Sequence, residues 1–264
     1  MNREQILALY DEQERKNSEH PSYRREVADG VVRSISKNPS RLSFIIYSQL
    51  TAETADAAIQ AQLDYFAASG SLGFEWKTYA HDTPADLGQR LTAHGLEGEE
   101  EEALLVMDLH NCPQVFLQPV TADVRRATNR AQFEQIAQLQ AQVWGGDYGW
   151  LVTQLEENLA LQPDFWSIYI AYVNNEPACA AWTSFPKGSQ FAGLWGGSTL
   201  DQYRKMGLYT AVVAIRAQEA LQRGYRFLMV DASDMSRPIL QKRGFQFMTH
   251  TTPYTWKNPL CSTS

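Results

Sequence analysis

The chain has 264 residues, 44% of them hydrophobic and 20% charged, which is typical of a globular protein with one large domain or two of about 100–150 residues. Its formal net charge of −7 argues against binding nucleic acid through phosphate contacts. Cys112, Cys179 and Cys261 are far apart and form no C-x-x-C pair, which argues against a metal cluster or a disulfide framework. A reducing compartment, a polar N-terminus and no long apolar run together predict a soluble cytoplasmic protein without a membrane span.

The first half of the chain has the alternating strand and helix pattern of an α/β unit. Its expected helices are 3–16, 51–68 and 83–94. Its expected strands are 31–36, 41–50, 74–80 and 103–109. The acidic run 97–102 is expected to be a solvated turn. Polar residues and two prolines at 111–119 predict a domain boundary there.

The second half begins at Val120 and again mixes strands with helices. Its expected helices are 130–143, 151–161, 207–223 and 236–243. Its expected strands are 166–173, 177–184, 191–200, 226–232 and 246–256, the first two forming a hairpin. The strand 226–232 is short and apolar, which is typical of a buried strand.

A weak internal repeat links the two halves. The spacing from Asp82 to Leu91 to Gly95 equals that from Asp231 to Leu240 to Gly244, and a long helix precedes each segment. We interpret the first half as a partial copy of the second, against the alternative that two α/β units look alike by chance. The long helix of the first half begins without Arg, Lys or Gly, so the phosphate-binding feature described next is expected only in the second half.

The segment 203–210 (YRKMGLYT) lies between a Gly-containing strand and a long helix. The first N–H groups of a helix have no intrahelical partner, and the helix dipole adds positive charge there. Arg204 and Lys205 add fixed charge, and Gly207 lets an anion approach the backbone closely. This combination favours a small phosphate-bearing ligand. Neither the P-loop string nor the dinucleotide-fold string occurs in the sequence.

The loop resembles the Q/R-x-x-G-x-G/A pyrophosphate loop of the GNAT superfamily, the acyl-CoA-dependent N-acyltransferases, with Arg204 and Gly207 matching and Tyr209 replacing the last small residue. The expected order of elements over about 130 residues, β-α-α-β-β-β-α-β-α-β, is also that of this fold. The resemblance implies an α/β protein with a mixed sheet, in which 118–258 is a GNAT acetyltransferase domain and 1–112 a degenerate GNAT-like unit. It implies acetyl transfer from acetyl-CoA to a primary amine of a small molecule, peptide or protein, without a metal. The alternative is a non-catalytic acyl-CoA-binding or regulatory module. A homodimer is compatible with either.

Carried over by resemblance, the cofactor-binding residues divide into three groups. The pyrophosphate would bind at the loop and helix start, which comprise Arg204, Lys205, Met206, Gly207, Leu208, Tyr209 and Thr210. The pantetheine would pair with a strand edge at Gly197, Ser198 and Thr199, where nearby glycines predict a bulged or splayed strand. Ser233 would hydrogen-bond the cofactor, although it is equally suited to capping a helix.

The catalytic groups are less clearly marked. Leu240 stands where the family often has a Tyr that protonates the leaving thiolate. Asp231, at the carboxyl end of a buried strand, is a candidate base or a structural carboxylate. Tyr209 would point toward the acyl group or fill the core, and His250 is more typical of a packing or surface residue.

The loop 144–150 (WGGDYGW) joins the first two helices of the second half. In the family this connection commonly borders the acceptor site. Trp144, Tyr148 and Trp150 with Asp147 would form an aromatic wall and an anion for a cationic amine. The alternative is a pair of buried aromatic residues that anchor the turn.

Overall fold

The computed structural model describes residues 1–259 and 261, which divide into two compact units. Unit 1 comprises 1–105, 231–242 and the C-terminal stretch from 246, and unit 2 comprises 106–230 and 243–245. The two domains expected from the sequence, 1–112 and 118–258, therefore differ from the compact units mainly at the C-terminus, which groups with the first half of the chain.

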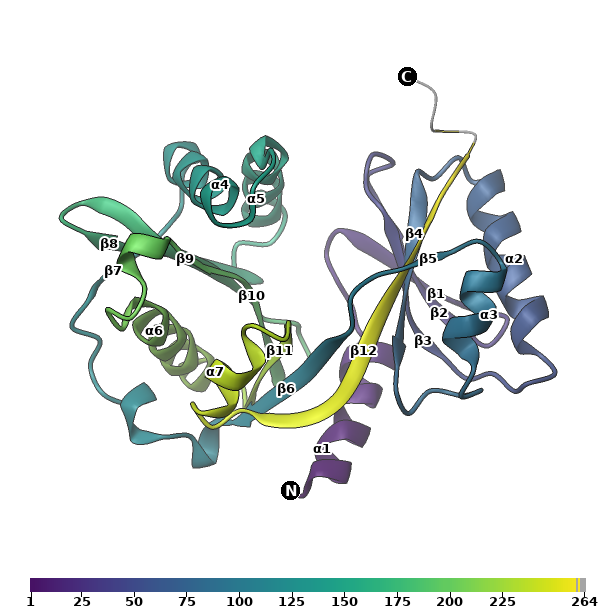
Figure 1. The fold of residues 1–264 in the computed structure, drawn as a ribbon, viewed down its shortest axis with the longest axis horizontal. Helices are drawn as coiled ribbons and strands as arrows, with labels where there is room; N and C mark the ends of the chain where they lie inside the picture. The colour runs from purple at the N-terminus through teal and green to yellow at the C-terminus, as the bar shows by residue number, and fades with distance from the viewer. Residues whose placement is uncertain (260, 262–264) are drawn as a thin grey trace. The chain divides into compact units, whose positions relative to one another are not determined.

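Unit 1 is an α/β unit whose strand order is β1-β2-β3-β4-β12-β6, with the short β5 also paired to β12 (Figure 1). Its helices are α1 (Arg3–Tyr10), the π-helical turn η1 (Asp11–Lys16), α2 (Ala55–Ala68), α3 (Leu87–Ala93) and α7 (Arg237–Gln241). Its strands are β1 (Tyr23–Ala28), β2 (Val31–Ser36), β3 (Ser43–Ser48), β4 (Gly73–Tyr79), β5 (Glu97–Gly98), β6 (Glu102–Asp108, whose last three residues belong to unit 2) and β12 (Gln246–Lys257).

Unit 2 continues from the end of β6 with the strand order β11-β10-β9-β8-β7. Its helical segments are η2 (Leu109–Asn111), η3 (Gln114–Phe116), α4 (Arg130–Trp144), α5 (Gly149–Leu161), η4 (Asp201–Tyr203) and α6 (Leu208–Gln222). Its strands are β7 (Asp123–Arg126), β8 (Trp166–Val173), β9 (Glu176–Ser184), β10 (Phe191–Thr199) and β11 (Phe227–Ala232, whose last two residues belong to unit 1).

Alternating side chains on β8 build two cores in unit 2. Ile168 and Ile170 pack with α4 and α5, whereas Tyr169 and Ala171 pack with α6. Figure 1 shows α4 and α5 on one side of this sheet and α6 on the other. Because successive side chains of a strand point to opposite faces, a strand covered on both faces carries apolar residues throughout, as β8 does.

The mixed α/β fold expected from the sequence is confirmed, and the second half of the chain follows the expected order β-α-α-β-β-β-α-β-α-β from β7 to β12. The sequence missed β1 and β5 and gave no bounds for β7, the first strand of the expected order. The acidic run 97–102 is not only a turn, because it contains β5 and the start of β6. These strands are short or strongly charged, so their propensity is weak and sheet pairing determines their conformation.

The internal repeat has a structural counterpart. In unit 1, β3 pairs in parallel with β4 over three residues, from Ser43↔Phe74 to Ile45↔Trp76. In unit 2, β10 pairs in parallel with β11 over three residues, from Phe191↔Phe227 to Gly193↔Met229. The repeat does not extend to the next strand of each sheet. In unit 1 the strand beside β4 is β12, which is antiparallel to it, and in unit 2 the strand beside β11 is the 106–108 end of β6.

Candidate acyl-CoA site

The middle of β10 is irregular, as its glycines predict. β10 follows β9 in antiparallel register up to Trp195↔Trp182 and resumes at Ser198↔Ala180, so the strand bulges between them. β10 pairs in parallel with β11 only from Phe191 to Gly193. The predicted bulge in β10 is thereby confirmed, and beyond Gly193 the strand edge offers backbone groups to a ligand.

Close neighbours crowd two glycines in the bulge, Gly196 more than Gly197. Gly196 has φ +61°, and a Cβ there would lie 2.0 Å from ring atoms of Trp182. A Cβ on Gly197 would lie 3.0 Å from the Tyr209 ring. The bulge is therefore clamped between an indole ring and the first turn of α6, and larger side chains would push it away from both.

A buried hydrogen-bond chain holds the bulge from the side of α4. Trp144 Nε1 donates to Ser198 Oγ at 2.8 Å, and Ser198 Oγ donates to Gln140 Oε1 at 2.9 Å. Gln140 Nε2 in turn donates to the backbone carbonyl of Gly196 at 2.8 Å. The Ser198 side chain thus holds the bulged strand in place. Sequence reasoning missed Gln140, because a Gln on an amphipathic helix carries no signal of such a partner.

The loop before α6 has the backbone conformation that an anion site requires. Lys205 has φ +64° and Gly207, the N-cap residue of α6, has φ +81°. The first intrahelical bond is Ala211 N–H to Gly207 C=O at 2.9 Å, so the N–H groups of 208–210 precede the helical ladder. Helix dipole and unused N–H groups favour a phosphate at this end of α6.

The basic side chains of the loop differ in their surroundings. Arg204 pairs with Asp201 at 2.8 Å and lies 3.4 Å from the backbone carbonyl of Thr199. Lys205 and Met206 are exposed, whereas Leu208 is buried in the core beneath the helix start. Because Arg204 neutralises Asp201, Lys205 is the stronger source of positive charge for a bound phosphate.

Tyr209 contributes to both the core and the bulge. It packs with Leu208 and Val212 on one side and faces Gly197 on the other. Burial raises the pKa of Tyr209, and the nearby Arg216 guanidinium opposes this shift. A phenol with a raised pKa stays protonated at neutral pH, so the Tyr209 hydroxyl is present as a hydrogen-bond donor there.

The side chains of the loop 144–150 contact different partners. Trp144 is joined to β10 through Ser198, while Tyr148 and Trp150 stack on each other with ring centroids 5.9 Å apart. Asp147 Oδ1 accepts a hydrogen bond from Gly149 N–H at 2.8 Å and thereby holds the start of α5. Trp144 and Trp150 are each about half exposed, so both present aromatic surface to solvent.

Asp231 and Ser233 belong to unit 1, whereas the contacts described above are within unit 2. Asp231 Oδ2 pairs with Lys77 Nζ at 2.7 Å. Ser233 supports the turn into α7, since its carbonyl accepts from Arg237 N–H at 2.9 Å and its hydroxyl lies 3.3 Å from that of Ser236. Leu240 is buried at 1% exposure. The base role of Asp231 and the cofactor contact of Ser233 stay predictions.

Comparison with known proteins identifies the fold. A GCN5-related N-acetyltransferase from Kribbella flavida superposes with a TM-score of 0.66 at 15% identity, over 89% of each chain. A tandem GNAT protein from the clavulanic acid biosynthesis pathway superposes with a TM-score of 0.61 at 10% identity, over 86% of this chain and 78% of the other. A protein of unknown function from Staphylococcus epidermidis gives 0.65 at 12% identity, over 90% and 96%. No family model and no curated protein matches the sequence. The chain therefore has the GNAT fold, in a two-unit arrangement.

One further feature of the described residues concerns membranes. None of their helices combines the length and the apolar character needed to cross a bilayer.

Proposed function

We propose that this protein is an acyl-CoA-dependent N-acyltransferase that moves an acetyl group from acetyl-CoA to a primary amine. The observation that carries the proposal is the combination in unit 2 of a bulged β10, which pairs with β11 only as far as Gly193, and a loop ending in the left-handed Gly207 at the start of α6. The three unpaired cysteines are consistent with action in the cytoplasm.

In this proposal the cofactor lies along the strand edge and the helix start. The pyrophosphate accepts hydrogen bonds from N–H groups of 205–210, and Lys205 adds positive charge. The pantetheine amides pair with backbone groups of 197–199, which the Gln140 chain keeps in place. The amine is bound against Trp144 and Trp150, whose rings favour a cation.

The reaction is a direct displacement in a ternary complex. The neutral amine nitrogen attacks the thioester carbonyl carbon, the new C–N bond forms, and the C–S bond breaks as the tetrahedral intermediate collapses. The products are the N-acetyl amine and CoA, and the proton that leaves nitrogen balances the one that the thiolate takes up. Tyr209 donates a proton to the thiolate, and the proton released from nitrogen passes through solvent to restore the Tyr209 phenol. A thiol of pKa about 8.5 is already a fair leaving group.

Calorimetric titration of the purified protein with acetyl-CoA tests the cofactor. We expect micromolar binding in the wild type and its loss in Gly207→Val, because a branched side chain blocks the approach of phosphate to the backbone. Gly95→Val is a matched control, since Gly95 also has a positive φ and open space around its Cα but lies in unit 1. Equal affinity of Gly207→Val and wild type would show that the loop assignment is wrong.

The alternative is a non-catalytic acyl-CoA-binding module, which is favoured by the buried Leu240 at the position where the family often has a Tyr. A turnover assay distinguishes the enzyme from this module. Release of CoA thiol in the presence of an amine supports the enzyme, and cofactor binding with no turnover for any amine supports the module. Tyr209→Phe is expected to lower kcat with little change in acetyl-CoA affinity. An unchanged rate for Asp231→Asn at limiting amine and near neutral pH would remove Asp231 as the base.

A further inference from the structure

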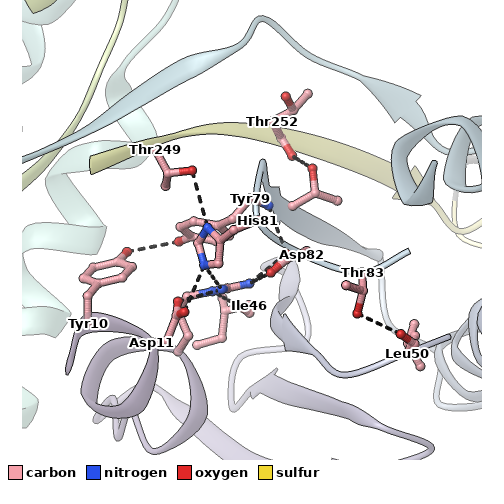
Figure 2. Close-up of polar contacts among 12 residues, drawn as sticks. Tyr10, Asp11, Ile46, Leu50, Tyr79, His81, Asp82, Thr83, Thr249 and Thr252 are labelled. Atoms are coloured by element: carbon pink, nitrogen blue, oxygen red, sulfur yellow. Dashed lines mark hydrogen bonds and ion pairs between the residues drawn. The ribbon is translucent and has the colours of Figure 1, made fainter. Parts of the chain in front are cut away.

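Unit 1 has a polar sheet face that the acyl-transfer proposal does not use. On β4, Phe74 and Trp76 point into the apolar core beneath α2 and α3. Because side chains alternate along a strand, Glu75, Lys77 and Tyr79 point to the opposite face. That face is covered by α1, where the Tyr10 and Tyr79 hydroxyls lie 3.0 Å apart (Figure 2).

The next strand, β12, adds hydroxyl groups to the same face. Thr251 is paired with Tyr79 in the sheet and Thr255 with Glu75, and residues paired in this way share a face. Thr255 Oγ1 donates to Glu99 at 2.8 Å. Thr251 is 1% exposed, and its hydroxyl has no hydrogen-bond partner among the described residues. A buried hydroxyl without a partner is costly, so this group is available to bond an atom of a ligand.

The face holds more negative than positive charge. Lys77 Nζ lies 2.7 Å from Asp231 Oδ2 and 3.2 Å from Glu102 Oε2. Glu75 and Glu99 bring the carboxylates to four against this one ammonium group. Asp231 Oδ1 is buried and, within the described part of the chain, accepts no hydrogen bond. The arrangement already holds one ammonium and leaves acceptors for another.

Glu75 responds to this excess of charge. Burial raises the pKa of Glu75 to about 7, the Lys77 ammonium opposes the shift, and Glu99, Glu102 and Asp231 add to it. From β1, Tyr23 also faces Glu75. From α1, Tyr10 faces Asp231. Near neutral pH the Glu75 carboxyl is therefore partly protonated, and a bound cation would displace that proton.

We propose that this face of unit 1 binds a small aliphatic diamine in its diammonium form, with Thr251 Oγ1, Asp231 Oδ1 and Glu75 as hydrogen-bond acceptors. An ammonium group has three donors and no acceptor, which matches a site composed of unpartnered oxygen atoms. Two positive charges offset most of the excess negative charge beside Lys77. The site goes beyond acyl transfer in unit 2 and does not depend on it.

The test is calorimetric titration of the full chain with 1,4-diaminobutane, with 1,4-butanediol as a neutral analogue of equal length. We expect binding of the diamine alone, weakened about ten-fold or more in Glu75→Gln and in Thr251→Val, because each removes one hydrogen bond to a charged group. Glu100→Gln is the matched control. Glu100 is an exposed carboxylate next to Glu99 in the chain, and its variant has the same formal net charge as Glu75→Gln.

Titration in two buffers of different ionisation enthalpy counts the protons released. Wild type is expected to release about half a proton per diamine at pH 7, because Glu75 is about half protonated there. Glu75→Gln is expected to release none. If that variant does not fold, proton release by wild type and the isosteric Thr251→Val still decide the question.

Three results would overturn the proposal. The first is no diamine binding by wild type, and the second is equal binding of the diol or of Mg²⁺. The third is binding that neither Thr251→Val nor Glu75→Gln weakens. Loss of acetyl-CoA binding in Gly207→Val is measured separately, so failure of one proposal does not imply failure of the other.

Discussion

Replacing Gly196 by Ala tests the packing that shapes the bulge in β10. Gly196 has φ +61°, which side-chain-bearing residues adopt at a cost of about 1–2 kcal/mol. The added Cβ would also lie 2.0 Å from the Trp182 ring, which must move, and overpacking of this kind costs about 1–3 kcal/mol. Ala has a lower conformational entropy than Gly in the unfolded chain, which stabilises the folded state by about 0.4–1 kcal/mol. We expect a net loss of about 2–4 kcal/mol.

Gly207→Ala separates the two contributions to this loss. Gly207 also has a positive φ, +81°, but no heavy atom lies within 4 Å of its added Cβ. Its expected loss of unfolding free energy therefore comes from the positive φ alone. It is about 1 kcal/mol or less, because the lower conformational entropy of Ala in the unfolded chain offsets part of the cost. The difference between the two variants, about 1–3 kcal/mol, measures the Trp182 contact.

Urea unfolding followed by tryptophan fluorescence measures both variants, and Trp182 itself reports on the bulge. Because two compact units can unfold separately, the transition of unit 2 is the one to compare. Equal loss of stability in Gly196→Ala and Gly207→Ala would refute the reasoning, since it would mean that Trp182 does not restrict the strand. Acetyl-CoA affinity is expected to fall in Gly196→Ala if the bulge forms the pantetheine edge.

Three further expectations concern buried polar groups. Ser198→Ala leaves Oε1 of the 3%-exposed Gln140 without its hydrogen-bond donor, so thermal unfolding should show a loss of about 1–3 kcal/mol, and an unchanged midpoint would contradict the hydrogen-bond chain. Thr251→Val removes an unpartnered hydroxyl and should stabilise the free protein by about 1 kcal/mol in urea, whereas a loss would mean that the hydroxyl is satisfied. Glu75 has a folded-state pKa of about 7, above its ordinary value, so the native state binds more protons and stability falls as pH rises from about 4.5 to 7, by roughly 2 kcal/mol. The difference between wild type and Glu75→Gln across this range isolates the effect, because His20, whose pKa burial lowers to about 4, contributes equally to both.

Much of the fold could be predicted from local pattern. The long helices and the apolar strands of unit 2 have strong periodicity, and their observed bounds lie within a few residues of those expected. The loop at 203–210 could be located because its signal is local, with glycine and basic residues at a helix start, and its binding of phosphate stays a prediction. The bulge in β10 was predictable for the same reason, since glycines in a strand indicate irregular pairing.

What could not be predicted depends on partners that are distant in the sequence. β12 pairs with β4 across more than a hundred and seventy intervening residues, and hydrogen bonds between strands leave no periodic trace. The role of Asp231 illustrates the consequence. Its position at the end of a buried strand left a catalytic base and a structural carboxylate open, and the structure pairs it with Lys77, which lies in the other half of the chain. A carboxylate can be located from sequence, but the cation that neutralises it cannot.

The same limit explains why the two units differ in what they offer to ligands. A helix start and a glycine-containing strand can bind an anion through backbone groups, so a phosphate ligand could be proposed for unit 2 from a few consecutive residues. The polar face of unit 1 is formed by side chains from β4, β12, β6 and β11, of which Lys77, Thr251 and Asp231 are examples. Each of these residues looks ordinary within its own strand. Only their common face reveals the excess of acceptors, so a side-chain site of this kind becomes visible only when the strand order is known.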